Sequence, residues 1–485
     1  MSADATHPPQ VLVVGAGPAG LVAGIALARH GIGVLLVEKR AAISTLSRAL
    51  VISTRSMEIL RAWGLEAAVR AGAANVEPCG WVTPTLASGE GVEIALGFPT
   101  AAQAAAVSPT RPAWAAQDHL EPLLLGLLRH YPSAQVRFDA ELIGLEQDDD
   151  GVTAAVRDRP SAGTQSVRAE FVIGADGAHS AVRELLGIRL EGPDNLAEFH
   201  AVQFHAPLTE LLGPRRYGLY VITHPDAACV IGRRGPGDRW GCAREWRPGQ
   251  DRLVDADEHR IAQLIRTAVG VPDLHPRIER TSAFSFAAQL ADHYRAGRGF
   301  VVGDAAHRMT PRGGTGMNTA IHDAYDLGWK LAWVLRGWAA PALLASYEAE
   351  RRPVGRHNVE RSGDPAGARR TAEEALPHDL HGRVAHHWLR PGDGAVSTLD
   401  LLGDGLTLLT ADDEAGWAAA AARLDTRAPI VVHAVGAPIA TAAGAAPNGA
   451  VLLRPDGKLA ASWTEPTVPP TADLTGLTPS MRAGS

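Results

Sequence analysis

Short apolar runs alternate with glycine turns at the start of the chain. Val11–Val14 is apolar and ends at a glycine, Leu21–Arg29 carries apolar residues at helical spacing, and Gly33–Val37 is apolar again. Uninterrupted apolar runs of this length are typical of parallel strands that are buried on both faces. The pattern therefore predicts a strand–helix–strand unit at the N-terminus.

The same patterns recur along the chain and predict an α/β fold. Phe171–Ile173 and Phe300–Val302 are further short apolar runs, whereas Ala140–Glu146 and Gly151–Val156 alternate like two strands joined by a turn. Arg361–Leu376 is polar and predicts a connector. Helical spacing predicts helices at Arg55–Ala68, His119–His130, Glu258–Ala268, Asn318–Arg336 and Ser346–Asn358.

Three later stretches have a different texture. Glu198–Arg247 alternates apolar with polar residues and is rich in aromatic residues and turns, which predicts an antiparallel sheet. After about Gly392 short strands and a helix return, which predicts a separate C-terminal unit. Thr464–Ser485 is rich in Pro, Thr and Ser and predicts a loose tail.

Length and composition place the chain among multidomain globular proteins. The 485 residues suggest about two to four domains. The formal net charge of −7 argues against the basic surface that nucleic-acid binding requires, so no nucleic-acid partner is expected. The 3 cysteines are too few and too scattered for a disulfide framework or a zinc site, which favours a reducing, cytoplasmic location.

One uncharged stretch, Val11–Ala28, has the length of a membrane-spanning segment at 18 residues. No Lys or Arg precedes it, as a signal peptide would require. It also contains 4 glycines and a proline, which suit a strand–turn–helix better than a spanning helix. No membrane association is therefore expected.

The turn between the first strand and the first helix reads Gly15-Ala16-Gly17-Pro18-Ala19-Gly20. In such a turn the first glycine permits the tight bend, the second lets a pyrophosphate approach the backbone, and the third lets the helix pack on the strand. Glu38 ends the next strand, where it can accept hydrogen bonds from a ribose. An acid there indicates a free 2′-hydroxyl, as in NAD or FAD, and argues against NADP at this site. A glycine turn that serves only helix–sheet packing is the alternative.

Two later strands also end in an aspartate beside a glycine. Phe171–Ile173 is followed by Asp176-Gly177, which alone predicts only a turn at a strand end. The next such strand is followed by Gly303-Asp304 and then by the glycine-rich segment Pro311–Asn318. A carboxylate at a strand end can bind the hydroxyls of a sugar or ribitol, and a helix that begins near Met317 would stabilise negative charge. A tightly packed helix N-terminus is the alternative for this loop.

In this order the three motifs resemble those of the class A flavin monooxygenases, the family of p-hydroxybenzoate hydroxylase, and most closely its branch of phenol and aromatic-polyketide hydroxylases. The resemblance covers most of residues 10–360. It implies an α/β fold with a discontinuous Rossmann-like FAD-binding domain, an interleaved antiparallel-sheet substrate domain and a C-terminal thioredoxin-like domain. The expected boundaries are 1–75, 111–190 and 285–390 for the FAD-binding domain, 76–110 and 191–284 for the substrate-binding sheet domain, and 391–485 for the C-terminal domain.

The resemblance also implies FAD as the cofactor and no metal. The residues that the family pattern places at the pyrophosphate and adenosine ribose are Gly15, Gly17, Ala19, Gly20, Glu38 and Lys39. Those placed at the ribitol and its phosphate are Arg48, Gln117, Gly303 and Asp304. Those placed along the isoalloxazine ring are Pro311, Gly314, Gly316, Met317 and Asn318. Asp176 matches a residue linked in the family to the use of both FAD and NAD(P)H.

The family reaction implies the remaining partners. NADPH or NADH binds transiently and reduces the flavin, molecular oxygen adds to give a C4a-hydroperoxide, and one oxygen passes to an aromatic, phenolic or polyketide-derived substrate. Baeyer–Villiger oxygenation, epoxidation and oxidative ring opening use the same flavin site and stay open, as does a flavoprotein without oxygenase activity. The segment after residue 390 contains no cysteine, so it is expected to serve structure or subunit contacts, with a homodimer as one option.

The substrate-activating base is where this chain departs from the phenol hydroxylases. Those enzymes carry an aspartate two residues after the position that Arg48 matches, and here that position is Leu50. No catalytic residue is therefore assigned. Arg312 is unusual in the glycine-rich segment, and both contact with an anionic substrate or the peroxide and a solvent-facing position stay open. The polar candidates on the predicted sheet, each with ordinary packing as its alternative, are His205, Tyr217, Tyr220, His224 and Arg233.

Overall fold

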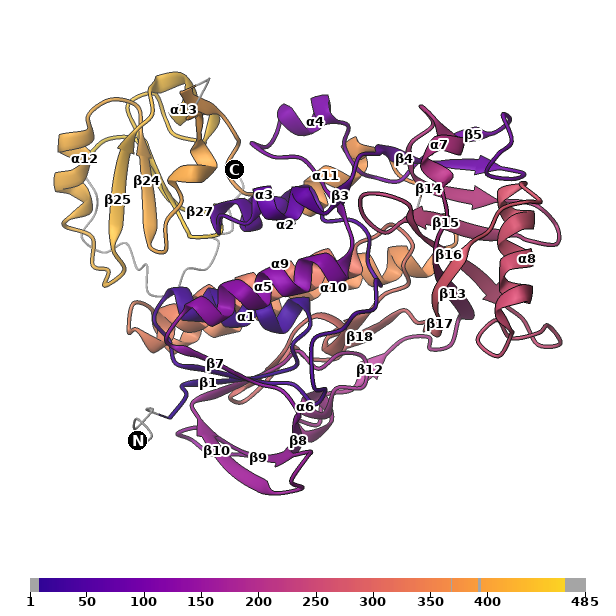
Figure 1. The fold of residues 1–485 in the computed structure, drawn as a ribbon. Helices are drawn as coiled ribbons and strands as arrows, with labels where there is room; N and C mark the ends of the chain where they lie inside the picture. Colours follow the sequence, from indigo (N-terminus) through magenta and orange to yellow (C-terminus); the bar gives the residue numbers. More distant parts are fainter. Residues whose placement is uncertain (1–7, 368, 391–393, 467–485) are drawn as a thin grey trace.

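The computed structural model describes residues 8–367, 369–390 and 394–466 (Figure 1). Most of the tail predicted from Thr464 onward lies outside these ranges. A central parallel sheet, an antiparallel sheet to one side of it and a C-terminal α/β unit to the other make up the described chain (Figure 1).

Five parallel strands and one antiparallel edge strand form the central sheet, in the order β19-β20-β11-β1-β2-β7. Their bounds are β1 (Val11–Val14), β2 (Val34–Val37), β7 (Ala134–Arg137), β11 (Phe171–Gly174), β19 (Arg295–Ala296) and β20 (Gly299–Val301). The chain leaves β1 through α1 (Pro18–Arg29) to reach β2 on one side, while β11 pairs with β1 on the other. The strand order therefore reverses at β1, and open α/β sheets bind their ligands at the carboxyl end of such a strand.

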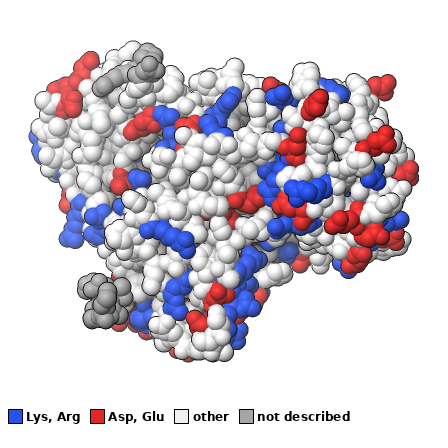
Figure 2. Space-filling model, in the orientation of Figure 1, with Lys and Arg blue, Asp and Glu red and all other residues white. Residues whose placement is uncertain are grey.

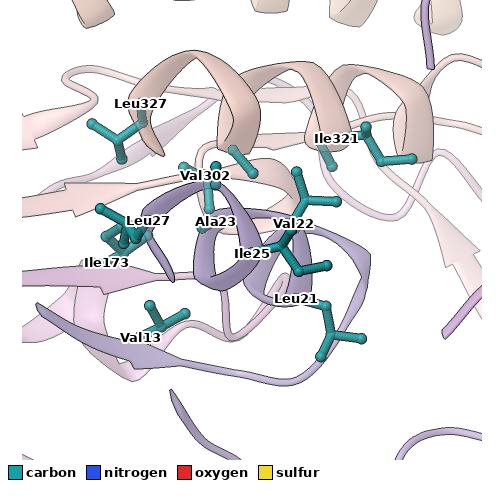
Figure 3. Packing of buried hydrophobic residues seen from close by; sticks show 14 of the residues in the cluster. Val13, Leu21, Val22, Ala23, Ile25, Leu27, Ile173, Val302, Ile321 and Leu327 are labelled. Atoms are coloured by element: carbon teal, nitrogen blue, oxygen red, sulfur yellow. The ribbon is translucent and has the colours of Figure 1, made fainter. Parts of the chain in front are cut away.

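Helix α1 lies in the core between the central sheet and α9 (Gly316–Leu335), and the close-up in Figure 3 shows their apolar side chains meeting. The predicted strand–turn–helix over Val11–Ala28 is confirmed. A Cβ atom on Gly328 of α9 would lie 2.5 Å from the Cβ of Ala26, so this glycine is what lets the two helices approach. α5 (Gln117–His130) packs against the same helix.

A three-stranded antiparallel sheet covers the other face of the central sheet. It consists of β8 (Ala140–Gln147), β9 (Val152–Asp158) and β10 (Thr164–Ala169), which confirms the strands predicted from the alternating pattern. Its apolar side chains form one cluster with Leu12 and Leu35 of the central sheet. Because neighbouring residues such as Val11 and Val13 belong to the cluster around α1, both faces of the central sheet are buried.

Seven strands form the second large sheet, in the order β17-β13-β16-β15-β14-β4-β5. Their bounds are β4 (Glu77–Thr83), β5 (Val92–Ala95), β13 (Ala197–His205), β14 (Tyr217–Ile222), β15 (Cys229–Arg233), β16 (Arg239–Trp246) and β17 (Arg277–Phe286). α8 (Glu258–Val269) covers one face, where its Ile261 and Ile265 share a core with Phe204 and Trp240. The antiparallel sheet predicted for Glu198–Arg247 is confirmed, although β14 pairs in parallel with β4.

The C-terminal unit is a four-stranded sheet, in the order β25-β24-β26-β27, in which only β24 and β25 are parallel. Its elements are β24 (Leu406–Thr410), α12 (Glu414–Ala421), β25 (Ile430–Ala434), α13 (Ala437–Ala442), β26 (Ala450–Leu453) and β27 (Leu459–Trp463). Leu406, Leu408 and Trp417 form one buried cluster with Trp329 and Trp333 of α9. The end of α9 is therefore part of the core of this unit.

The helix predicted for Arg55–Ala68 is wrong in its continuity. The structure has α2 (Thr54–Ala62) and α3 (Glu66–Ala71), separated at Gly64. Gly64 has a φ of 76°, in the left-handed region that glycine adopts without strain, and it ends the first helix.

The polar connector predicted for Arg361–Leu376 is also wrong. This segment contains the end of α10 (Ala345–Gly363) and the start of α11 (Ala372–Leu380). Thr371 and Glu374 form a capping box at the start of α11, a helix signal that the polar composition concealed.

The remaining elements are short. They are β3 (Ala73–Ala74), α4 (Ala101–Ala105), β6 (Trp114–Ala115), α6 (Ala181–Leu185), β12 (Leu190–Glu191), α7 (Leu208–Leu212), β18 (Gln289–Ala291), β21 (His307–Arg308), β22 (Trp388–Arg390) and β23 (Val396–Ser397). Within the described ranges, no helix is both long and apolar enough to cross a bilayer. On the face drawn in Figure 2, basic and acidic side chains are interspersed over the antiparallel sheet.

Candidate functional site

The glycine loop between β1 and α1 is crowded on one side and open on the other. Gly15 has a φ of 106°, and a side chain on it would collide with the carbonyl group of Ala175. A side chain on Gly20 would collide with the carbonyl oxygen of Gly15, whereas a Cβ atom on Gly17 would meet nothing within 4 Å. The backbone at the N-terminus of α1 is therefore accessible at Gly17, as a bound pyrophosphate requires.

The first and third motifs touch through their smallest residues. Gly303 has a φ of 59°, and a Cβ atom on it would lie 3.2 Å from the Cβ of Ala19 and 2.9 Å from that of Ala320. Ala19 is itself buried. The Gly303 loop is thus seated between the starts of α1 and α9, and only glycine fits there.

Glu38 connects the end of β2 to the glycine loop. Its Oε2 accepts a hydrogen bond from the backbone N–H of Ala16 at 2.9 Å, and its Oε1 accepts one from the N–H of Arg40 at 3.0 Å. The neighbouring Lys39 is exposed. A carboxylate has about four acceptor positions, so Glu38 can hold the loop and still accept hydrogen bonds from a ligand.

Asp304 lies in the turn that follows β20. Its side chain is solvent accessible, yet enough protein surrounds the carboxyl group to raise its pKa through burial, while His307 and Arg48 oppose that shift. Arg48 is exposed and close enough for its charge to act on Asp304.

Asp176 organises the turn before α6. It accepts hydrogen bonds from the hydroxyl of Ser180 and, at 3.1 Å, from the backbone N–H of Val182, and burial raises its pKa. Arg183 follows on α6 and donates to the carbonyl oxygens of Ala178 and Ala305, at 3.1 and 3.4 Å. The second motif is therefore bonded directly to the Gly303-Asp304 loop.

The glycine-rich segment is held by Asn318 in the first turn of α9. The side-chain amide of Asn318 donates to the carbonyl oxygens of Val51 and Gly314, at 3.1 and 3.0 Å. Its oxygen accepts from the backbone N–H of Ser53 and the hydroxyl of Ser56, both at 2.8 Å. All four hydrogen-bonding positions of this buried side chain are used, which fixes the start of α9 against the segment that precedes α2.

The other members of this segment form its accessible rim. Pro311 is exposed, and Met317 packs partly against the core around α1. A Cβ atom on Gly316 would come no closer than 4.0 Å to Met309, and a Cβ atom on Gly314 would meet Val51 at 2.9 Å. The first N–H groups of α9 therefore face space that protein atoms do not fill.

Gln117 is hydrogen-bonded to Glu121, a carboxyl group that the sequence analysis does not single out. The Gln117 backbone N–H donates to the carbonyl oxygen of Ala49 at 3.0 Å, and its side-chain amide donates to Oε1 of Glu121 at 2.6 Å. Oε2 of Glu121 has no partner among the described residues. Burial raises the pKa of Glu121 to about 7, against the opposing effects of Gln117 and Arg48.

The candidate bases on the sheet have partners within or beside the sheet. Tyr220 belongs to the core beneath α8 and donates to the Arg215 carbonyl, and Arg233 lies over the ring of Trp240 in the same core. The other candidates have local partners as well: Tyr217 stacks on Trp81, His224 accepts from the Asp226 N–H, and His205 pairs with Glu279.

Leu50 and Arg312, two further residues near the motifs, contact other parts of the protein. Leu50 points to β15, where a Cβ atom on Gly232 would meet its Cδ1 at 3.2 Å. The guanidinium of Arg312 lies 5.4 Å from the ring centre of Phe286 and donates to the Gly363 carbonyl at 3.4 Å. Neither residue supplies a general base, so no catalytic residue is assigned.

Two arginines from the antiparallel-sheet region hold the loop that carries Arg48. Arg234 donates to the Ser47 carbonyl at 2.7 Å, and Arg280 donates to the Thr45 hydroxyl at 3.0 Å. A third, Arg239, pairs with Asp118 of α5 at 2.6 Å. These contacts could not be predicted from the sequence, because the partners belong to elements that are distant in the chain.

A buried relay lies behind the Gly303-Asp304 loop. Nε2 of His307 lies 2.6 Å from Oδ2 of Asp323, and Oδ1 of Asp323 accepts from Nε of Arg351 at 2.7 Å. These side chains are almost completely buried. His307 therefore belongs to the buried packing behind this loop.

Three acids gather where the C-terminal unit meets α9 and α10. Ligand atoms of Asp326, Glu350 and Asp456 lie within 4.8 Å of one another. Cations already stand between them, since Lys330 lies 2.7 Å from Asp326 and Arg454 lies 2.8 Å from Glu350. This is a buried ion-pair cluster that fastens the turn after β26 to the two helices.

A cavity that is open to solvent adjoins the glycine-rich segment. Gly313–Thr315 form one wall, Leu96–Pro99 a second, and the end of α10 with α11 a third.

Comparison with known proteins agrees with this geometry. Residues 9–362 match the family model for an FAD binding domain, and residues 378–482 match that for the C-terminal domain of aromatic-ring hydroxylases. The chain is 35% identical over 519 residues to tetracenomycin B2 monooxygenase-dioxygenase of Streptomyces olivaceus, covering 94% of this chain and 95% of that protein. It is 35% identical to aklavinone 12-hydroxylase DnrF of Streptomyces peucetius, covering 84% and 92%.

The fold is shared with solved flavoenzymes. The crystal structure of a ternary complex of aklavinone-11 hydroxylase with FAD and aklavinone is 30% identical and superposes with a TM-score of 0.86 over 97% of this chain and 98% of that one. The expected fold class, with its FAD-binding, sheet and C-terminal domains, is thereby confirmed. The chain therefore belongs to the class A flavin-dependent aromatic monooxygenases, and it is an FAD-dependent monooxygenase.

Proposed function

We propose that this chain hydroxylates a phenolic or polyketide-derived aromatic molecule, with molecular oxygen and NADPH or NADH as co-substrates. The observation that carries the proposal is the contact between the three motifs: Gly303 lies against Ala19 and Ala320, and Arg183 donates to the carbonyl oxygen of Ala305. The polyketide hydroxylases among the relatives support the substrate class.

The residues of the three motifs fit FAD, since the backbone is open at Gly17 and the carboxylate of Asp304 is accessible. We assign the pyrophosphate and adenosine ribose to Gly15, Gly17, Ala19, Gly20, Glu38 and Lys39. We assign the ribitol and its phosphate to Arg48, Gln117, Gly303 and Asp304, with Asp176 supporting that loop. We assign the isoalloxazine ring to Pro311, Gly314, Gly316, Met317 and Asn318.

Bound FAD supplies the redox chemistry and the activation of oxygen, and the protein supplies position, dryness and charge. Asn318 fixes the first turn of α9, whose unpaired N–H groups stabilise negative charge by up to about 2 kcal/mol in a partly buried site. Phe98 and Trp114 meet edge to face at 5.2 Å beside Val51, and this apolar cluster keeps water from that side of the segment.

The domain boundaries, the cellular location and the oligomeric state are also part of this proposal. The domain boundaries stay at 1–75, 111–190 and 285–390, at 76–110 and 191–284, and at 391–485; separate core clusters support the division between the first two domains, whereas the end of α9 shares a core with the C-terminal unit. Cys79, Cys229 and Cys242 are free thiols, which supports a reducing, cytoplasmic location. A homodimer is part of the proposal without an assigned surface.

The test is turnover with purified holoenzyme. Protein reconstituted with FAD is expected to be yellow, to oxidise NADPH or NADH faster when a phenolic polycyclic substrate is present, and to add one atom from isotopically labelled oxygen gas to it. Mass and NMR spectra of the product separate hydroxylation from Baeyer–Villiger oxygenation, epoxidation and ring opening. Colourless protein that cannot be reconstituted, or nicotinamide oxidation that no aromatic stimulates, would contradict the proposal.

A further inference from the structure

The cavity beside the glycine-rich segment has a cationic wall that the flavin assignment does not use. Arg361 at the end of α10 and Arg370 before α11 both line it, together with His357 and His378. Asp379 is the one carboxyl group among the described lining residues, and its Oδ2 already accepts from the backbone N–H of Arg55 at 3.0 Å. The wall therefore carries an excess of positive charge.

Arg361 is a buried cation without a counter-ion. Its residue is 8% exposed, Nη2 donates to the Thr315 hydroxyl at 2.9 Å, and Nη1 donates to the Gly367 carbonyl at 3.5 Å. Its Nε has no hydrogen-bond partner in the described chain. Burial, and then Arg370, lower its pKa to about 10, and no carboxylate opposes them. A buried charge of this kind is costly unless something pairs with it.

The side chains around Arg361 add to its positive potential and do not neutralise it. Nη1 of Arg370 lies 3.3 Å from Nε2 of His357, whose ring stacks on that of His378 with 4.0 Å between ring centres. The pKa of His357 is lowered by burial and then by His378, Arg370 and Arg361. Two cations and two imidazoles thus surround a space in which none of the described acids is free to pair with them.

Another wall of the cavity is apolar. Phe98 lies beside Gly314, since a Cβ atom on Gly314 would meet its ring at 3.2 Å, and Leu96 and Pro99 continue this wall. An open cavity lined by an aromatic side chain and by two arginines suits a ring system that bears an acidic group.

We propose that this cavity binds the carboxylate of an acidic aromatic substrate through Arg361 and Arg370, with the ring system against Phe98. This proposal rests on the proposed function, because it treats the cavity as the substrate's approach to the flavin. It adds that the chain prefers carboxylated aromatic molecules over their neutral analogues, and that Arg361 and Arg370 determine this preference.

The test compares two probes that differ only in the carboxylate, 3-hydroxy-2-naphthoate and 2-naphthol. Their binding to holoenzyme and to FAD-free protein is measured by titration calorimetry, so that the result does not depend on turnover. Wild-type protein is expected to bind the acid more tightly. Arg361→Gln and Arg370→Gln are each expected to weaken binding of the acid by about 10- to 100-fold, and to leave the neutral probe unchanged, because a charge-assisted hydrogen bond is lost.

Three controls make the outcome specific. Arg369→Gln removes the same charge from an exposed neighbour that does not line the cavity, and it is expected to change neither probe. Arg361→Lys keeps the charge and is expected to restore part of the affinity for the acid. FAD affinity is measured for every variant, because Arg361 also contacts Thr315.

Equal affinity of the wild type for both probes overturns the proposal. So does an equal loss of both probes in Arg361→Gln, which would make this arginine a support of the glycine-rich segment. Unchanged acid binding with slower reduction by NADPH would assign the cations to the nucleotide instead. Failure to bind FAD or to oxygenate any aromatic contradicts the proposed function, whereas a holoenzyme that oxygenates but does not discriminate the acid contradicts this inference alone.

Discussion

The side-chain amide of Asn318 donates a hydrogen bond to the backbone carbonyl of Val51 across 3.1 Å and 267 positions of sequence. The oxygen of the same amide accepts from the N–H of Ser53 at 2.8 Å. One buried side chain therefore sets the distance between the first turn of α9 and the segment before α2. These two segments form opposite sides of the entrance to the proposed isoalloxazine site.

Replacing Asn318 with Ala should cost both stability and cofactor affinity. Buried groups at Val51, Ser53 and Ser56 would lose partners, which is expected to lower the free energy of unfolding by about 2–4 kcal/mol. FAD affinity is expected to fall by about tenfold or more, since the loop would no longer be fixed. Urea denaturation of the FAD-free protein and a fluorescence titration with FAD measure the two effects. Asn318→Asp keeps the acceptor but places an oxygen against the carbonyl oxygens of Val51 and Gly314, so it should not restore the lost stability.

Asp304→Ala should separate cofactor affinity from stability. Asp304 is accessible, and burial raises its pKa, so the FAD-free protein is expected to be as stable as wild type or slightly more stable. FAD affinity is expected to fall by about 10- to 100-fold, because charge-assisted hydrogen bonds to the ribitol hydroxyls are lost. A fluorescence titration measures this, with Asp304→Asn as the isosteric control. Normal FAD binding by the Ala variant would show that the ribitol assignment is wrong.

Two glycine substitutions form a matched pair. Gly303→Ala places a methyl group 2.9 Å from Ala320 at a φ of 59°, so the free energy of unfolding is expected to fall by about 1–3 kcal/mol. Gly17→Ala meets no atom within 4 Å and has a φ of −77°, so the FAD-free protein should stay within about 0.5 kcal/mol of wild type. FAD binding by the Gly17 variant should nevertheless weaken. Equal stability of the two variants would contradict the packing described for the loop.

Glu121→Gln should change how stability depends on pH. The folded-state pKa of Glu121 is raised to about 7 by burial, so the native protein holds a proton that the unfolded chain has released above its ordinary value of 4.5. Wild-type stability is therefore expected to fall as pH rises from about 4.5 to 7, whereas the Gln variant lacks this loss and should be about 1–3 kcal/mol more stable at pH 8. Thermal unfolding across this range measures it. Parallel pH profiles of the two proteins would show that Glu121 is ionised in the fold.

Removing the chain after residue 390 should damage solubility more than the flavin spectrum. Trp329 and Trp333 would lose their cover, and the ion-pair cluster around Glu350 would keep unpaired charges. Light scattering and the visible spectrum of the truncated protein, measured together, separate the two effects. Loss of the flavin spectrum from a monodisperse truncated protein would contradict this prediction.

Features that depend on neighbouring residues could be predicted from the sequence, whereas contacts between segments that are distant in the chain could not. The glycine loop after β1 was readable, because strand, turn and helix are neighbours in the chain. The contact of Arg234 with Ser47 was not, since nothing in either segment marks the other as its partner. Glu121 was missed because a single acid on a helix gives no signal of burial. The break at Gly64 and the capping box at Thr371 were present in the sequence and were overlooked.

Helix α9 begins at the proposed flavin site and ends among the tryptophans that the C-terminal unit covers. A chimera in which this chain is joined to a homologue at residue 390 would therefore combine half of one hydrophobic core with half of another. Chimeras that instead exchange α9 together with the C-terminal unit would keep that core whole, at the cost of importing the partner's flavin segment. Parental origin of this one helix should therefore govern which hybrids fold.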